Sequence, residues 1–120
     1  MFSPAYALAA ASPAVQALLG NPPRFTSFGN APQDGAKPYA VQQTITGSPE
    51  NYLGQLPDMD SLSVQVDVYA RVMADAKAIT VALRDAFEPA GYVTSWNGEF
   101  FEADTKLWRI SFTVDFKIPR

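Results

Sequence analysis

The chain contains neither cysteine nor histidine among its 120 residues. It therefore has no thiol nucleophile, no disulfide, none of the Cys/His ligand sets that hold zinc, and not the commonest general base. Carboxylates, lysines and hydroxyls are the side chains left for chemistry. We accordingly expect a protein that is not an enzyme, with no catalytic residues, no cofactor and no metal.

Positive charge is also scarce. Nine Lys and Arg residues against twelve Asp and Glu give a formal net charge of -3 and a pI near 4.7. Proteins that grip nucleic acid through its phosphates usually carry a basic patch. Binding of DNA through its phosphates is therefore disfavoured. If the protein lies beside DNA, its net negative charge suits a wall along which the DNA slides.

Long apolar runs are missing as well. No run approaches the about 20 residues that a membrane span needs, and the segment from Met1 to Leu8 lacks the basic stretch of a secretory signal. We expect no membrane contact and a protein made in the cytoplasm. With 48% hydrophobic residues, the chain can bury one core, so residues 1–120 are read as a single domain.

Helices are expected in two regions. The alanine-rich segment from Pro4 to Leu19 ends at Gly20, and Ser12-Pro13 inside it predicts a kink or a fresh start at Pro13. The segment from Met73 to Ala90 has an apolar stripe that predicts an amphipathic helix. This stripe consists of Ala76, Ile79, Leu83, Ala86 and Phe87.

Alternation with period two predicts strands from Tyr39 to Thr46, from Leu62 to Tyr69 and from Leu107 to Ile118. The stretch from Asn21 to Lys37 is rich in proline and glycine and predicts a loop, with a short edge strand at Arg24 to Phe28. One side of the sheet is expected to pack on Ile79, Leu83 and Phe87. That side carries Leu62, Val64, Val66, Val68, Ile110, Phe112 and Val114.

Asn97-Gly98 is the strongest short-range signal for a two-residue hairpin, so Tyr92 to Trp96 and Glu99 to Ala103 are expected to pair around it. A second turn is expected at Asp104-Thr105. These elements predict an α+β fold, with an antiparallel sheet of about four to five strands packed against the amphipathic helix and the N-terminal helix.

The acidic residues near this hairpin could form a catalytic site, since a carboxylate pair can perform acid-base chemistry. Glu99, Glu102 and Asp104 instead alternate with apolar residues as an exposed strand edge would, and charges there hinder unwanted pairing. Asp58 with Asp60 is the nearest approach to a metal-binding pair, and a solvated turn is the better interpretation.

The best candidate for a binding surface is the segment from Ser48 to Asp60, interpreted as a long exposed loop because it lacks periodicity and contains proline and glycine. Apolar side chains on such a loop fold back on the domain or bind a partner. The loop's apolar residues are Tyr52, Leu53, Leu56 and Met59.

Two residues outside this loop are further interface candidates. Trp96 lies beside the expected hairpin, and aromatic residues are enriched at binding surfaces. Arg109 lies on the polar face of the last strand, where it either pairs with Asp67 on a neighbouring strand or contacts another subunit.

Four segments follow one another in an order and spacing that resemble a known family: ASPAVQALLG, APQDGAKPYAVQQTITGSPENYLG, LSVQVDVYARVMADAKAITVALRDAF and DTKLWRISFTVDFKI. Over about Ala11 to Ile118 the chain resembles the tail-completion or tail-terminator family of long-tailed bacteriophages. None of the shared motifs is catalytic; they are structural.

Proteins of that family form a ring, usually a hexamer, at the head-proximal end of the tail tube. The ring stops tube polymerisation and presents a surface to head-completion proteins. The resemblance implies a virion structural protein, assembled in the host cytoplasm, with three partners: its own copies, the tube protein and a head-completion or connector protein. DNA would pass through the lumen without specific binding.

Other functions remain open at this point. A head-completion or tail-tube subunit would share the size and the lack of chemistry, but tube subunits polymerise indefinitely whereas a terminator closes and stops. A small hydrolase or ligand-binding α+β enzyme would have to work with Asp and Lys residues, and no carboxylate pair lies in a recognisable pocket-forming motif.

Overall fold

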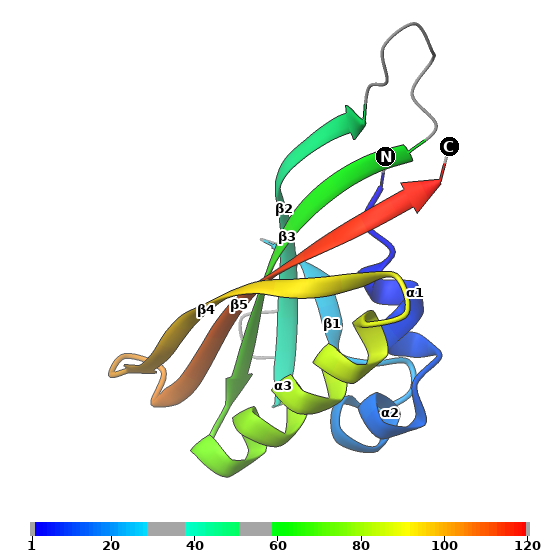
Figure 1. Ribbon diagram of the computed structural model, residues 1–120. Helices are drawn as coiled ribbons and strands as arrows, with labels where there is room; N and C mark the ends of the chain where they lie inside the picture. Colours follow the sequence, from blue (N-terminus) through cyan, green and yellow to red (C-terminus); the bar gives the residue numbers. More distant parts are fainter. Residues whose placement is uncertain (1, 29–37, 51–58, 120) are drawn as a thin grey trace, which may run out of the picture.

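The computed structural model describes residues 2–28, 38–50 and 59–119, which form a sheet covered on one side by helices (Figure 1). The helices are α1 (Ala5–Ala10), α2 (Pro13–Leu19) and α3 (Met73–Phe87). The strands are β1 (Phe25–Ser27), β2 (Tyr39–Glu50), β3 (Met59–Ala70), β4 (Gly91–Glu102) and β5 (Leu107–Pro119). Within these described residues the sheet order is β1-β2-β3-β5-β4. The predicted α+β class is confirmed.

The sheet is mixed rather than wholly antiparallel. The pairs β2–β3, β3–β5 and β5–β4 are antiparallel as predicted. The short strand β1 instead runs parallel to β2, with Phe25 beside Ala40. A connection of more than ten residues separates the two strands along the chain, and it leaves room for the return that a parallel pair requires.

The core lies between α3 and the sheet face that the alternation predicted. In the β3–β5 ladder Val64 lies opposite Val114 and Val66 opposite Phe112, so their side chains share one face. The residues predicted for this face, and their three partners on α3, all belong to one buried cluster: Leu62, Val64, Val66, Val68, Ile79, Leu83, Phe87, Ile110, Phe112 and Val114. The predicted core face is confirmed.

Phe87 holds the centre of this core. Its ring centroid lies 5.5 Å from that of Phe116 in an edge-on arrangement, 6.2 Å from Phe25 and 6.5 Å from Phe112. Offset and edge-on aromatic pairs at such separations are favourable beyond the area they bury. The last turn of α3 is thereby fixed to β1 and to β5 at once.

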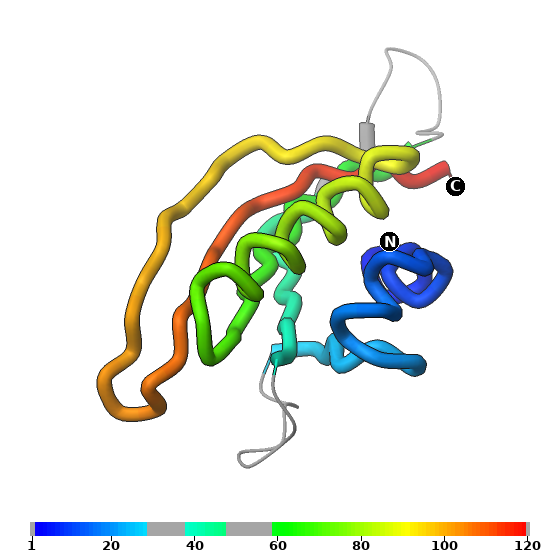
Figure 2. Tube along the Cα trace, turned by 90° about the horizontal axis from the view of Figure 1, so that it is seen from below, coloured from blue at the N-terminus to red at the C-terminus, as the bar shows by residue number. Residues whose placement is uncertain are grey.

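The N-terminal segment forms two helices with a fresh start at Pro13, as its sequence predicts. The Ser12 Oγ accepts a hydrogen bond from the Val15 backbone N–H at 3.3 Å and caps the helix. Pro13 fits the first turn, because a backbone N–H there would have no acceptor within the helix. Figure 2 shows α1 and α2 beside α3, on the same side of the curved sheet. Ala5, Ala9 and Leu19 complete the core there.

The expected hairpin at Asn97-Gly98 is wrong, because β4 runs through these residues without turning. The ladder with β5 shifts register there, between Trp96 and Gly98, and Gly98 has a positive φ of 123°. The dipeptide therefore makes a bulge, another structure that glycine with positive φ permits. The Asn97 side-chain amide donates to the Thr113 Oγ1 at 3.1 Å, which ties the bulge to β5.

The turn between β4 and β5 falls where the second turn was predicted, around Asp104-Thr105. The Lys106 N–H donates to the Glu102 carbonyl at 2.7 Å and closes it. Lys106 itself has a φ of 57°, in the left-handed region.

The predicted ends of three elements are also wrong. β2 continues past Gly47 to Glu50, and β3 already begins at Met59, so both ends of the expected loop from Ser48 to Asp60 are strand. Pro49 pairs with Asp60 in this ladder. Proline is tolerated because, in the described part of the chain, β2 beyond β1 has only β3 as a neighbour, and an edge strand can lack an N–H on its free side. The amphipathic helix ends at Phe87, short of the expected Ala90.

Candidate protein interface

The sheet face opposite the helices carries a polar surface made by the alternate residues of β3 and β5. Two cross-strand hydrogen bonds order this face: the Ser63 hydroxyl donates to the Asp115 carboxylate at 2.6 Å, and the Lys117 ammonium donates to the Ser61 hydroxyl at 2.7 Å. Because these side chains satisfy one another, the face is ordered before any partner arrives.

Arg109 lies on this polar face and is held from two sides. Its Nη1 lies 3.8 Å from the Asp67 Oδ2, and its guanidinium carbon lies 4.5 Å from the centroid of the Phe100 ring. Asp67 is itself buried, so the pair is screened less than a surface pair. Of the two interpretations offered by the sequence, the pairing with Asp67 is confirmed, and a subunit contact through Arg109 stays a prediction.

Tyr39 and Tyr69 stack beside this pair, with ring centroids 4.9 Å apart and planes inclined by 17°. Burial, the largest cause, and the nearby carboxylates of Asp67 and Glu102 together raise the pKa of Tyr69 to about 12, against an opposing effect of Arg109. Burial also raises the pKa of Tyr39, with a smaller contribution from Glu102. Both phenols therefore keep their protons well above neutral pH.

Stability should fall in the alkaline range because of Tyr69. Between the ordinary tyrosine pKa of 10.0 and the folded-state pKa of about 12, the unfolded chain has lost this proton while the native chain retains it. The native state then binds more protons than the unfolded state, so the free energy of unfolding decreases as the pH rises.

The measurement is a titration of tyrosinate absorbance in the folded protein. The last step should lie near a pKa of about 12, which the environment of Tyr69 produces, and Tyr69→Phe should remove it. If Tyr69→Phe removes a step at the ordinary tyrosine pKa instead, the packing described for this face is incorrect.

β4 is the last strand of the sheet formed by the described residues, and it exposes four aromatic side chains, Trp96 and Phe101 on the helix side and Tyr92 and Phe100 on the polar side. Tyr92 is 53% exposed, Trp96 56%, Phe100 41% and Phe101 52%. Their inner sides rest on the neighbouring strand: the Trp96 ring lies 5.4 Å from Phe112 and the Phe101 ring 4.9 Å from Trp108. A hollow of about 210 Å³ lies beside Trp96, over Gly98 and Ile110. Aromatic rings so grouped on one strand are typical of a binding surface.

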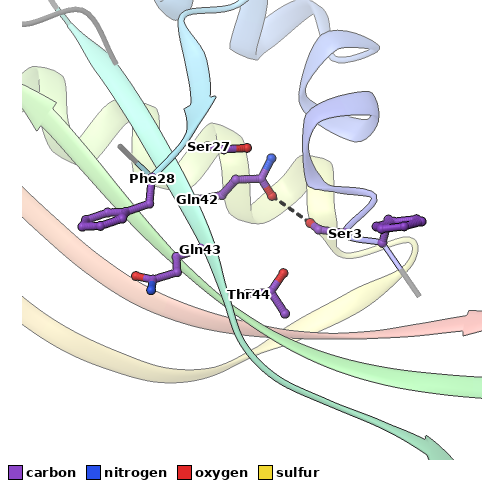
Figure 3. Close-up of a pocket in the computed structure, with 7 residues that line it drawn as sticks. Ser3, Ser27, Phe28, Gln42, Gln43 and Thr44 are labelled. Atoms are coloured by element: carbon purple, nitrogen blue, oxygen red, sulfur yellow. Dashed lines mark hydrogen bonds between the residues drawn. The ribbon is translucent and has the colours of Figure 1, made fainter. Parts of the chain in front are cut away.

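A larger pocket lies near the other edge of the sheet, where the segment before α1 meets β2 (Figure 3). Its volume is about 480 Å³, and its lining includes Phe2, Phe28 and Thr44. The Ser3 hydroxyl donates to the Gln42 side-chain oxygen at 2.8 Å and joins the two segments. Five of the seven lining residues are polar, and Phe2 and Phe28 are the two aromatic ones; the polar residues are Ser3, Ser27, Gln42, Gln43 and Thr44.

The residues predicted for the interface do not form one cluster. Tyr52, Leu53 and Leu56 lie outside the described residues. Met59 is half-buried at the start of β3, opposite Pro119. Trp96 pairs with Phe112 on the helix side of the sheet, whereas Arg109 lies on the polar side.

Sequence reasoning missed the exposure of Phe100 and Phe101. The two residues are adjacent in β4, and neighbours on a strand point to opposite faces. A one-sided core can cover only one of them, so the pair Phe100-Phe101 was the signal for an exposed aromatic residue on this strand.

Metal and membrane sites were searched for in the described part of the chain. Residues 2–28, 38–50 and 59–119 contain no group of three or more His, Cys, Asp or Glu side chains placed to hold a metal ion. Asp58 of the acidic pair lies outside these ranges, and Asp60 is buried in β3. None of the three helices described is long and apolar enough to cross a membrane.

The chain is similar to a family of tail completion proteins and to a chain of a phage-like virion particle. A family model described as Tail completion protein gp17 matches residues 4–118. Among solved structures, the fold is similar to that of a chain in the "Virion of native gene transfer agent (GTA) particle", with a TM-score of 0.70 and 13% sequence identity over 97% of this chain and 92% of that one. No curated protein sequence matches significantly.

The domain is thus of a class that serves as a structural component of a virion tail. The family match covers almost the whole described fold, and the chain belongs to the Tail completion protein gp17 family. The resemblance noted in the sequence is confirmed.

Proposed function

We propose that the protein caps the head-proximal end of a phage tail tube as a ring, ends tube polymerisation and joins the tail to the head. The observation that carries this proposal is the tail-completion family match over residues 4–118, which spans every helix and strand from α1 to β5. The similarity in fold to a chain of a gene transfer agent virion supports it.

The proposed partners are other copies of the chain in a ring, a hexamer by resemblance, together with the tube protein and a head-completion or connector protein. Assembly takes place in the host cytoplasm, and no enzymatic step is involved. DNA passes through the lumen without specific binding. The charges of the polar sheet face support this last point, because Asp67 and Asp115 accompany Arg109 and Lys117 there, and a balanced surface offers phosphates no net attraction.

Tyr52, Leu53, Leu56 and Met59 are proposed to contact a partner within the tail, and Trp96 and Arg109 to lie at subunit interfaces. Met59 supports this grouping, since it starts β3 directly after the other three residues and keeps part of its side chain exposed.

Electron microscopy of the purified protein tests the assembly behaviour. We expect monomers or small closed rings in physiological salt, because a subunit that terminates a tube must present a surface that accepts no further layer. Long tubes formed by the pure protein would instead make it a tube subunit. Binding to isolated heads without any binding to tube ends would make it a head-completion protein.

A further inference from the structure

We infer that the aromatic edge of β4 in one copy docks into the pocket at the β2 edge of the next copy, so that the ring is closed by contacts between opposite edges of the sheet. This inference rests on the proposed ring. It specifies the contact surfaces, which no comparison assigns.

The first argument is the area that the β4 edge leaves uncovered. Fully burying an aromatic side chain removes about 150–250 Å² from water, so Trp96 and Phe101, which lie on the helix side and are each about half exposed, represent roughly 200 Å². A standard interface buries about 800 Å² on each partner, a little over half of it apolar. The two helix-side rings of β4 therefore supply a little under half of the apolar part of one such interface.

The second argument is that the β4 edge is shaped for side-chain docking rather than for indiscriminate strand pairing. Register shifts fall between Val93 and Ser95 and between Trp96 and Gly98, and Glu99 is exposed between the rings. Bulges and charges on an edge strand oppose generic pairing with other chains. Rings held from below by Phe112 and Trp108 are already ordered for binding.

The third argument is the pocket on the opposite edge. The open pocket of about 480 Å³ has room for an aromatic side chain, which would contact Phe2 and Phe28 as well as the polar side chains of Ser3, Ser27, Gln42, Gln43 and Thr44. Phe2 and Phe28, which flank it, are 89% and 65% exposed. Among the described residues, β2 has a neighbour on one side only beyond β1, and we infer that a second copy approaches there.

The two surfaces also face the same way. Trp96 pairs with Phe112 and Phe101 with Trp108, which places both rings on the helix side of β4. On β2, Thr44 pairs with Val64 and is likewise on the helix side. If the sheet of one copy continues toward the β2 edge of the next, with helices on the same side, the rings meet the pocket. Such a head-to-tail contact between unlike surfaces generates a ring when the rotation from one copy to the next closes.

Because the natural chain has no cysteine, single cysteines can report this contact directly. Glu99→Cys marks the β4 edge and Thr44→Cys marks the pocket, both at exposed positions. The two single variants are mixed with a short bismaleimide crosslinker, as pure protein at high concentration and again with tube protein present. We expect covalent heterodimers from the mixture, none from either variant alone, and closed covalent rings from the double variant.

Matched controls separate docking from random collision. Lys77→Cys, exposed on α3, should not crosslink with Glu99→Cys. Phe101→Ser should reduce the crosslinked yield by about tenfold or more, as loss of an interface hot spot does. Trp96→Ser should act alike, and its circular dichroism must match the natural chain because Trp96 also touches Phe112.

Two results would overturn the inference: crosslinks that join only one Glu99→Cys chain to another, or no crosslinks either in the pure protein or with tube protein present. The proposed function fails separately, when the protein leaves tube growth unaffected even though the Thr44–Glu99 crosslink forms. Capped tubes without this crosslink would retain the function and reject the interface.

Discussion

Replacing Phe112 by alanine is expected to lower the free energy of unfolding by about 3 to 5 kcal/mol. Phe112 is fully buried at the centre of β5, opposite Val66, and its ring contacts those of Phe87 and Trp96. Truncation removes apolar contacts and leaves a cavity bounded by two elements, β3 and α3, that are fixed by many other contacts. Such a cavity cannot collapse fully, so the expected loss in the free energy of unfolding is among the larger ones for core substitutions.

Denaturant unfolding of the monomer measures this change. Phe2→Ala is the matched control, since it makes the same chemical change at a side chain that is 89% exposed, and it should alter stability by no more than about 0.5 kcal/mol. A loss below about 1 kcal/mol for Phe112→Ala would mean that the two sheet faces have been assigned backwards.

Replacing Tyr52, Leu53 and Leu56 together by serine is expected to give a folded domain that fails to complete tails. These three apolar residues lie between the end of β2 at Glu50 and the start of β3 at Met59. The proposed role is a contact with a partner, whose apolar area the serines would remove. In a complementation assay, the yield of infectious particles should fall to that obtained without the protein.

The control for this variant removes apolar side chains elsewhere on the surface. Val72→Ser combined with Val81→Ser alters two residues that are about half exposed, at the start and middle of α3, and it should complement normally. Normal particle yield from the triple variant would instead move the contact to Asn21–Lys37 or to the surroundings of Trp96.

Periodicity predicted the helix and strands that are buried on one face and exposed on the other. The stripe on α3 and the alternation in β3 and β5 identify the core face because each element is covered on one side by the other. The start of α2 at Pro13 was predictable for a local reason, the Ser12 cap. These features depend on residues near in sequence or on a repeated pattern.

Features that depend on distant strands were not predictable. Asn97-Gly98 has the local preferences of a hairpin, but β5 offers partners along the whole of β4 and turns the same dipeptide into a bulge. Pro49 signals the end of a strand in isolation and is accommodated at an edge once β3 pairs with it. Tertiary pairing overrides local preference in both cases.

The candidate interface was predictable to a similar extent. The alternation in two strands predicted the ion pair between Arg109 and Asp67, and this pair is present in the structure. Trp96 is exposed, though on a continuous edge strand and not beside a hairpin. The exposure of Phe101 depends on β4 being the last strand of the sheet, which is a property of the strand order and not of the local sequence.

The most direct test of the proposed function is growth of tail tubes from purified tube protein, followed by electron microscopy with and without this protein. The account predicts tubes that carry one ring at a single end and do not lengthen at that end when fresh tube subunits are added. Tubes that continue to grow at both ends, or that incorporate the protein along their length, would contradict it.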